Sequence, residues 1–157
     1  MSDADAVIIG GGVVGTAIAR AFSRFRLDVV LLEREFELAW GTTKANSGIV
    51  HSGCHNTPGT AKARLCVRGN RLLARLAAEL HVPFRRNGSL IVAFTPEEAA
   101  VLDEWFAHGR ANGVPRMRLI TGRTARKLEP ALSPEVLRAL EAPTAGVVSP
   151  YELAFAL

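Results

Sequence analysis

The stretch that decides the fold is AVIIGGGVVG, residues Ala6–Gly15, in which a short apolar run leads into closely spaced glycines. A continuous apolar run of this length is typical of a strand buried in a parallel sheet. The glycines fit the pattern G-x-G-x-x-G, and apolar residues then recur at helical spacing, at Ala17, Ile18, Ala21 and Phe22. A second apolar run, Asp28–Leu32, ends at Glu33 and predicts a second buried strand.

Each part of this unit has a mechanical role in binding a dinucleotide. Gly10 permits the tight turn, Gly12 lets a pyrophosphate approach the backbone, and Gly15 lets the helix pack closely against the strand. The helix N-terminus offers free N–H groups and the positive end of its dipole to the phosphates. Glu33 can accept hydrogen bonds from ribose hydroxyls, which favours an unphosphorylated ribose. The order of these parts predicts a Rossmann-like unit of an α/β protein.

The bulk composition narrows the functional class. The chain has 157 residues, of which 48% are hydrophobic and 22% charged, so we expect a globular protein with a real core. The net charge of +4 is mild and aromatic residues are 6% of the chain, which argues against a nucleic-acid partner. No apolar run is long enough to span a membrane. Peripheral membrane contact stays an open alternative.

Two further features predict a cytoplasmic location. The only cysteines, Cys54 and Cys66, form no C-x-x-C pair and are expected to be reduced thiols. The N-terminal sequence carries aspartates where a signal peptide needs positive charge.

A long loop follows the second strand, from Arg34 to about Thr57, with little periodicity. A plain NAD-binding fold usually returns quickly to a helix and a third strand, so the loop argues against an NAD-dependent dehydrogenase, which stays an alternative. Lys44–His55, KANSGIVHSGCH, includes His51, Cys54 and His55. These residues lack the paired spacings of a structural zinc site, so no metal is predicted. Cys54 is expected to be a small buried side chain.

The sequence resembles the FAD-dependent oxidoreductases of the D-amino-acid oxidase type. The resemblance begins with VIIGGGVVGTAIARAF and VVLLERE. It narrows at ANSGIVHSGCHNTPGTAKARLCVRGNRLL to a branch that contains L-2-hydroxyglutarate dehydrogenases or oxidases and FAD-dependent glycerol-3-phosphate dehydrogenases. The segments NGSLIVAF, NGVPRMRLI and APTAGVVSPYELAFAL continue it in order, so it covers essentially the whole chain.

The resemblance implies that FAD is the cofactor and that the loop lies along the flavin. Thr42, Thr43 and Lys44 correspond to contacts with the pyrophosphate and ribityl chain. The residues expected to lie close to the cofactor are Asn46, Ser47 and Gly48, and those expected to pack against the ring system are Ile49 and Val50. At Gly48 the absent Cβ would permit close backbone approach.

His51 is the residue that we expect to carry chemistry. Oxidation of a secondary alcohol requires removal of the hydroxyl proton as hydride leaves for flavin N5, and an imidazole titrates in the right range to accept that proton. Two alternatives stay open. His51 could hydrogen-bond the flavin or position the substrate without acting as a base, or it could attach the flavin covalently.

The remaining segments predict the rest of the architecture. Thr57 and Pro58 are expected to begin a helix whose apolar face contains Leu65, Leu72, Leu73, Leu76 and Leu80. A basic stripe on that helix, Arg64, Arg68, Arg71 and Arg75, is expected to be solvated, with docking of an acceptor or of the rest of the protein as the alternative. Further elements are predicted as a strand at Leu90–Phe94, a helix capped by Thr95, a strand at Met117–Ile120, a short helix at Thr121–Leu128 and a strand at Gly146–Val148.

Members of the resembling family are typically two to three times longer than this chain. The resemblance therefore implies an incomplete FAD-binding domain with the start of an α+β substrate domain. We expect residues 1–82 to belong to the FAD-binding domain and 83–149 to the substrate domain. Residues 150–157 are expected to start a helix that returns to the FAD domain, in a truncated chain.

The resulting functional prediction is FAD-dependent oxidation of a small anionic secondary alcohol, either L-2-hydroxyglutarate or glycerol 3-phosphate. Electrons would then pass to a quinone, a redox protein or oxygen. Arg85, Arg86 and Arg118 are candidates for meeting an anionic substrate. The competing hypothesis is an inactive truncated fragment, or a nucleotide-binding module without catalysis.

Overall fold

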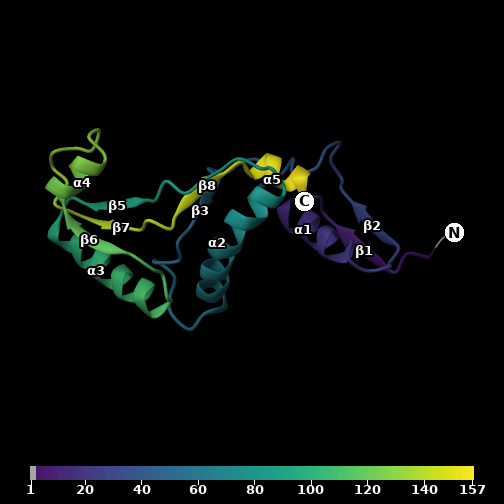
Figure 1. Cartoon of the computed structure of the whole chain (residues 1–157), viewed down its shortest axis with the longest axis horizontal. Coiled ribbons are helices and arrows are strands. Elements are labelled where there is room, and N and C mark those ends of the chain that lie inside the picture. The colour runs from purple at the N-terminus through teal and green to yellow at the C-terminus, as the bar shows by residue number, and fades with distance from the viewer. Residues whose placement is uncertain (1–2) are drawn as a thin grey trace. The chain divides into compact units, whose positions relative to one another are not determined.

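The computed structural model describes residues 3–157, which form two compact units (Figure 1). Unit 1 contains the described residues up to Gly48, together with Leu76–Phe84 and Val148–Leu157. Unit 2 contains Ile49–Arg75 and Arg85–Val147. The functional domain boundaries, at residues 1–82, 83–149 and 150–157, stay a prediction.

Unit 1 is built on a βαβ arrangement. Strands β1 (Ala6–Ile9) and β2 (Val29–Leu32) pair in parallel, with Ala6 opposite Val29 and Ile9 opposite Leu32. Helix α1 (Val13–Phe22) connects them in sequence, and helix α5 (Pro150–Ala156) packs against α1. Parallel strands need such a crossover because a short hairpin cannot join them. The α/β class and the predicted strand–helix–strand unit are confirmed.

The prediction that both strands are buried is wrong for much of their surface. Ile8 is buried, but Ile9 is 87% exposed, and Val7 and Leu32 are also exposed. Apolar residues on both faces suit a sheet that is covered on both sides. In residues 3–157 this sheet contains only β1 and β2, so much of its apolar surface faces solvent.

Unit 2 contains a three-stranded antiparallel sheet in the order β5 (Leu90–Ala93), β7 (Arg138–Glu141), β6 (Arg118–Thr121). Helix α3 (Pro96–Ala111) packs against this sheet, as Figure 1 shows, and its side chains join those of the strands in one core. The Thr95 hydroxyl caps α3 by accepting a hydrogen bond from the Glu98 amide at 3.2 Å, as predicted. The central strand β7 was not predicted from the sequence.

A second small sheet has the order β3–β8–β4. Strand β3 (Ile49–Val50) lies antiparallel to β8 (Gly146–Val148), and β4 (Phe84–Arg85) lies on the other side of β8. The prediction of β8 is confirmed, while β3 and β4, with two residues each, are too short to show a sequence period. The short helix α4 (Gly122–Leu128) follows β6 and is capped by the Thr121 hydroxyl, which accepts from the Thr124 amide at 3.2 Å.

Helix α2 (Ala61–Glu79) begins later than the sequence predicted. Gly59 has a positive φ of 82°, which is incompatible with helix continuation from Thr57. Thr60 instead caps the helix, because its hydroxyl accepts a hydrogen bond from the Ala63 amide at 3.2 Å. The prediction that Thr57 and Pro58 start this helix is therefore wrong.

The predicted apolar face of α2 is also partly wrong. Leu65 is 58% exposed and Leu72 is exposed as well. The buried positions are occupied by smaller residues, at Ala63, Val67, Asn70 and Ala77. The four arginines of the predicted basic stripe are exposed, in agreement with a solvated face. None of the helices in residues 3–157 combines the length and the apolar character that a membrane crossing requires.

Candidate functional site

The glycine turn between β1 and α1 has the geometry that its sequence predicts. Gly10 has a φ of 105°, a backbone conformation that favours glycine. A Cβ at Gly15 would collide with the Gly10 carbonyl oxygen. A Cβ at Gly12, the N-cap residue of α1, would lie 3.0 Å from the Thr43 hydroxyl. The turn thus brings backbone, helix N-terminus and loop into close contact.

Thr43 connects the long loop to the start of α1. Its hydroxyl accepts a hydrogen bond from the Val13 amide at 3.1 Å, which is one of the N–H groups that a helix N-terminus leaves without an intrahelical partner. Gly12 itself has no side chain that could cap the helix. The N-terminus of α1 is therefore met by a neutral hydroxyl, while its positive dipole end still favours an anion.

Glu33 lies just after β2 and faces the same turn. Its Oε2 accepts a hydrogen bond from the Gly11 amide at 2.6 Å, and its Oε1 accepts one from the Glu35 amide at 3.0 Å. These amides, that of Glu35 first, lower the pKa of the Glu33 carboxyl below its ordinary value. The lowered pKa keeps the side chain ionised at neutral pH, which suits an acceptor for ribose hydroxyls.

A pocket of about 390 Å³ brings most of these parts together. Of the predicted cofactor residues, it is lined by Gly10, Gly12, Glu33, Thr42 and Thr43. Gly15 lines an adjoining pocket of about 480 Å³, together with side chains of β1 and α1. An ionised carboxylate, a glycine turn and a helix N-terminus thus line one pocket, which is the combination that a dinucleotide requires.

The first pocket also contains residues that the sequence reasoning missed, namely Arg34, Glu35, Trp40 and Gly41. Trp40 also contacts Phe36, with 4.5 Å between the ring centroids. A tryptophan in a loop without periodicity was the available signal. The Lys44 ammonium, predicted to contact the cofactor, lies over the Trp40 ring at 2.8 Å from its centroid.

The next predicted residues shape the loop. The Asn46 amide donates to the carbonyl oxygens of Thr42 and Thr43, at 3.2 and 2.7 Å, and its Oδ1 accepts from the Gly48 amide at 2.9 Å. Ser47 is exposed. The structure therefore gives Asn46 a role in holding the backbone, and its contact with a cofactor stays a proposal.

Gly48 is buried, with a φ of 66°. A Cβ at this position would collide with the Val148 carbonyl oxygen and would lie 3.2 Å from the Pro150 ring. Protein packing at the start of α5 is thus sufficient to require glycine here. The predicted reason, close approach to a cofactor, is an additional hypothesis.

The remaining predicted residues, Ile49, Val50 and His51, belong to unit 2. Ile49 is exposed and Val50 is buried in β3. His51 is exposed, and its ring meets the His55 ring edge to face, with 5.1 Å between centroids. An exposed imidazole next to a second imidazole can exchange protons with a ligand.

The thiols beside these histidines do not form a reactive site. Cys54 is 1% exposed, which confirms the expected small buried side chain, and its Sγ lies 4.0 Å from Nδ1 of His55. Burial raises the pKa of the Cys66 thiol. Burial also lowers the pKa of the His55 imidazole, and the neighbouring His51 and Lys62 lower it further. Across residues 3–157, no three His, Cys, Asp or Glu side chains gather as metal ligands would.

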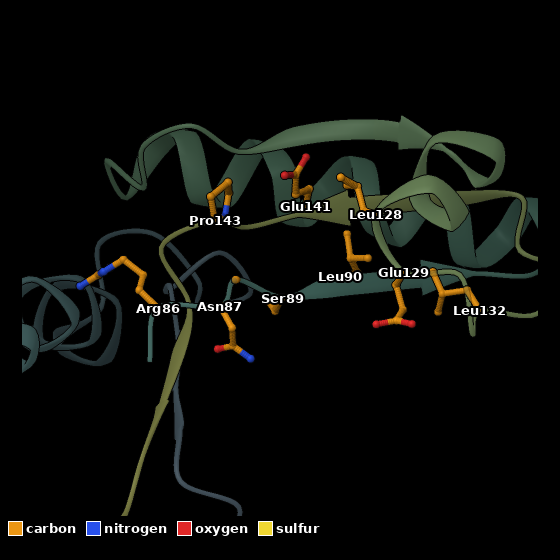
Figure 2. A pocket seen from close by; sticks show the side chains of 10 residues that line it. Arg86, Asn87, Ser89, Leu90, Leu128, Glu129, Leu132, Glu141 and Pro143 are labelled. Atoms are coloured by element: carbon orange, nitrogen blue, oxygen red, sulfur yellow. The ribbon is translucent and has the colours of Figure 1, made fainter. Parts of the chain in front are cut away.

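Unit 2 has a pocket of about 550 Å³ beside β5 and α4 (Figure 2). Two of the candidate arginines, Arg86 and Arg118, have protein partners here. The Arg86 guanidinium extends away from Leu90 and Glu129 and donates to Asn70 Oδ1 at 3.1 Å and to the Thr144 carbonyl at 2.7 Å. Arg118 pairs with Glu141, which lines the pocket, at 2.7 Å.

Comparison with known proteins agrees with the geometry of unit 1. Residues 5–157 match the family described as DAO, FAD dependent oxidoreductase. The glycerol 3-phosphate dehydrogenase of Caloramator mitchellensis is 40% identical over 153 residues, which are 98% of this chain and 32% of that protein. The mitochondrial L-2-hydroxyglutarate dehydrogenase of Homo sapiens is 40% identical over 149 residues, which are 94% of this chain and 32% of that protein.

A solved structure extends the comparison to the fold. The dithionite-reduced L-α-glycerophosphate oxidase from Mycoplasma pneumoniae, with FAD bound, aligns with a TM-score of 0.92 at 30% identity. The alignment covers 99% of this chain and 41% of that one. The chain spans about a third of the length of the curated relatives that it matches.

Proposed function

Because the chain belongs to the family of FAD-dependent oxidoreductases, we propose that it binds the adenosine and pyrophosphate part of FAD within an enzyme that oxidises a small anionic secondary alcohol. The observation that carries this proposal is the pocket shared by Glu33 and the glycine turn. A carboxylate and a helix N-terminus that belong to one pocket match the ribose and the pyrophosphate of a dinucleotide.

The proposed cofactor contacts follow from this arrangement. Glu33 accepts hydrogen bonds from the ribose hydroxyls, and the backbone around Gly12 receives the pyrophosphate at the start of α1. The Thr43 hydroxyl, which accepts from the Val13 amide at 3.1 Å, can also donate to a phosphate oxygen. Loop residues Lys44, Asn46, Ser47 and Gly48, with Ile49 and Val50 after them, complete the proposed contacts. When bound, FAD supplies an acceptor for the hydride of the alcohol.

His51 is the proposed general base. The alcohol must lose its hydroxyl proton as the carbon–hydrogen bond breaks, and the neutral imidazole takes up that proton. Its exposure leaves the ring accessible to a substrate. Hydrogen bonding to the flavin, substrate positioning and covalent attachment of the flavin are the competing roles.

The proposed substrates are glycerol 3-phosphate and L-2-hydroxyglutarate. Both are anionic secondary alcohols, and relatives that are 40% identical are named for them. A quinone, a redox protein or oxygen would then accept the electrons. We also propose a cytoplasmic location, which is supported by the two free thiols.

A second candidate is a fragment that holds nucleotide without catalysis. The glycine-turn pocket favours it, because His51, the proposed base, is not among the residues that line this pocket. The visible absorption spectrum of the purified chain, before and after anaerobic addition of each substrate, separates the two functions. Bleaching of a flavin spectrum by one substrate supports the enzyme and names its reaction. A flavin spectrum that neither substrate changes supports the fragment.

A further inference from the structure

We propose that Asn70 is a positioning residue for His51, which it fixes through the His51 backbone carbonyl. This inference rests on the proposed role of His51 as the base. Asn70 lies on α2 and is 5% exposed, although it is a polar residue in the middle of an amphipathic helix. A buried side-chain amide requires hydrogen-bond partners, and one of the partners of Asn70 is the His51 carbonyl.

The amide of Asn70 is fully used. Its Nδ2 donates to the His51 carbonyl at 3.0 Å and to the Thr144 carbonyl at 2.9 Å, and its Oδ1 accepts from the Arg86 guanidinium at 3.1 Å. Carbonyl oxygens therefore surround the NH₂ group and a cation faces the oxygen. A flipped amide would place oxygen against oxygen, so this arrangement permits a single orientation.

Arg86 strengthens the arrangement from the other side. Besides Asn70 Oδ1, it donates to the Thr144 carbonyl at 2.7 Å and to the Asn70 carbonyl at 3.3 Å. Bonds from a charged guanidinium are stronger than those between neutral groups. The arginine thus connects α2, which carries Asn70, to the segment before β8, which carries Thr144. This network fixes the point from which Asn70 holds His51.

Cys66 makes a second contact with the same carbonyl. It lies one helical turn before Asn70 on α2, and its Sγ is 3.7 Å from the His51 oxygen. Burial raises the pKa of this thiol, so it keeps its proton and can donate. Two side chains of one helix therefore converge on one backbone oxygen of the loop.

This anchor matters because His51 lies at the end of a very short strand. The residue follows the two-residue strand β3 directly, and its own side chain is exposed. With the carbonyl held, the imidazole moves mainly by rotation about its side-chain torsions. The edge contact with His55 restricts that rotation. A proton acceptor must lie within hydrogen-bond reach of the reacting hydroxyl, and a displacement of about 1 Å can slow a reaction by about 100-fold.

The chain offers a matched control in Asn112. Its Nδ2 also donates to two carbonyl oxygens of the same loop, those of Gly53 and Asn56, at 3.1 and 2.7 Å. It does not bond to His51. Asn70→Ser and Asn112→Ser each remove an amide that donates to carbonyl oxygens of this loop, and only the first releases the His51 carbonyl.

The test is nuclear magnetic resonance of the histidine ring signals in this chain, with the His51 signal assigned by its loss in His51→Asn. We expect Asn70→Ser to move the His51 ring shift towards that of a free histidine, while Asn112→Ser leaves it in place. Unchanged values in a folded Asn70→Ser chain, or equal changes in both variants, would overturn the inference. If Asn70→Ser does not fold, Cys66→Ala decides by the same criterion, with a smaller shift expected.

A kinetic measurement separates this inference from the proposed function. If substrate reduces the flavin, Asn70→Ser should slow reduction at saturating substrate by about tenfold or more, with FAD retention unchanged. Normal reduction in His51→Asn would refute the role of His51 as base and leave the ring-signal result standing. A displaced His51 ring with an unchanged reduction rate would refute the positioning role alone.

Discussion

The Glu33 carboxylate accepts a hydrogen bond from the Gly11 amide at 2.6 Å, which joins the end of β2 to the glycine turn after β1. Two features that the sequence separates by 22 residues therefore form one site within the chain itself. The acid is held in place and ionised before any nucleotide is bound. Preorganisation of this kind lowers the cost of ordering a site when a ligand enters it.

The first prediction concerns stability at acid pH. The folded state lowers the pKa of Glu33, so its carboxylate stabilises the fold above the ordinary pKa of a glutamate, and this contribution is lost as the pH falls through the lowered value. Glu33→Gln should therefore flatten the acid limb of stability against pH. Urea unfolding between about pH 6 and pH 3 measures this limb, and parallel curves for the two proteins would contradict the prediction.

The second prediction compares two glycines. A Cβ in Gly15→Ala would collide with the Gly10 carbonyl, so we expect destabilisation of about 1–3 kcal/mol. Gly69 lies in α2 with open space where a Cβ would extend, so Gly69→Ala should stabilise the helix by about 0.5–1 kcal/mol. Denaturant unfolding of both variants tests the pair. Equal effects of the two substitutions would show that the glycine turn is looser than described.

The third prediction concerns His51. If the imidazole takes up the hydroxyl proton, His51→Asn should slow anaerobic flavin reduction by about 10²-fold to 10⁴-fold, with FAD retention unchanged. His81→Asn is a suitable control, because that exposed histidine belongs to unit 1 and to no predicted site. Stopped-flow absorbance measures the rate. Loss of FAD in His51→Asn would point instead to a role in holding the cofactor.

The sequence predicted the glycine turn well because each of its parts is local. Strand, glycines, helix and second strand follow one another, and their spacing reflects steric requirements that the structure bears out at Gly10 and Gly15. The short strand β7 was missed because its residues, Arg138–Glu141, carry charges at both ends and few apolar side chains. Pairing with β5 and β6 on both sides makes it the central strand, which is a non-local effect.

The start of α2 was predicted wrongly for a local reason. Threonine followed by proline suits a helix start, but Gly59 takes a positive φ and moves the start to Ala61. The burial of Asn70, and not of Leu65 or Leu72, could not be predicted from periodicity, because the polar partners of Asn70 lie far away in the sequence. Hydrophobic patterning does not reveal such networks.

The candidate site was predictable where a backbone requirement selects the residue type. Gly12 and Glu33 belong to this class. Trp40 and Gly41 were not predicted, because a loop without periodicity does not show by its pattern which side chains line a pocket. The presence of a tryptophan in the loop was the one available signal, and it was not used. Gly48 is required by packing against the Val148 carbonyl. This contact could not be predicted either, because Val148 is distant in the sequence.

The central claim is that this chain binds FAD through the pocket formed by Glu33 and the glycine turn. The most direct measurement is an FAD titration of the chain by flavin fluorescence, with Glu33→Ala compared to the exposed control Glu135→Gln. We predict saturable binding that Glu33→Ala weakens by roughly 10- to 150-fold in Kd and that Glu135→Gln leaves unchanged. Equal affinities in all three proteins, or no binding by the unaltered chain, would contradict the claim.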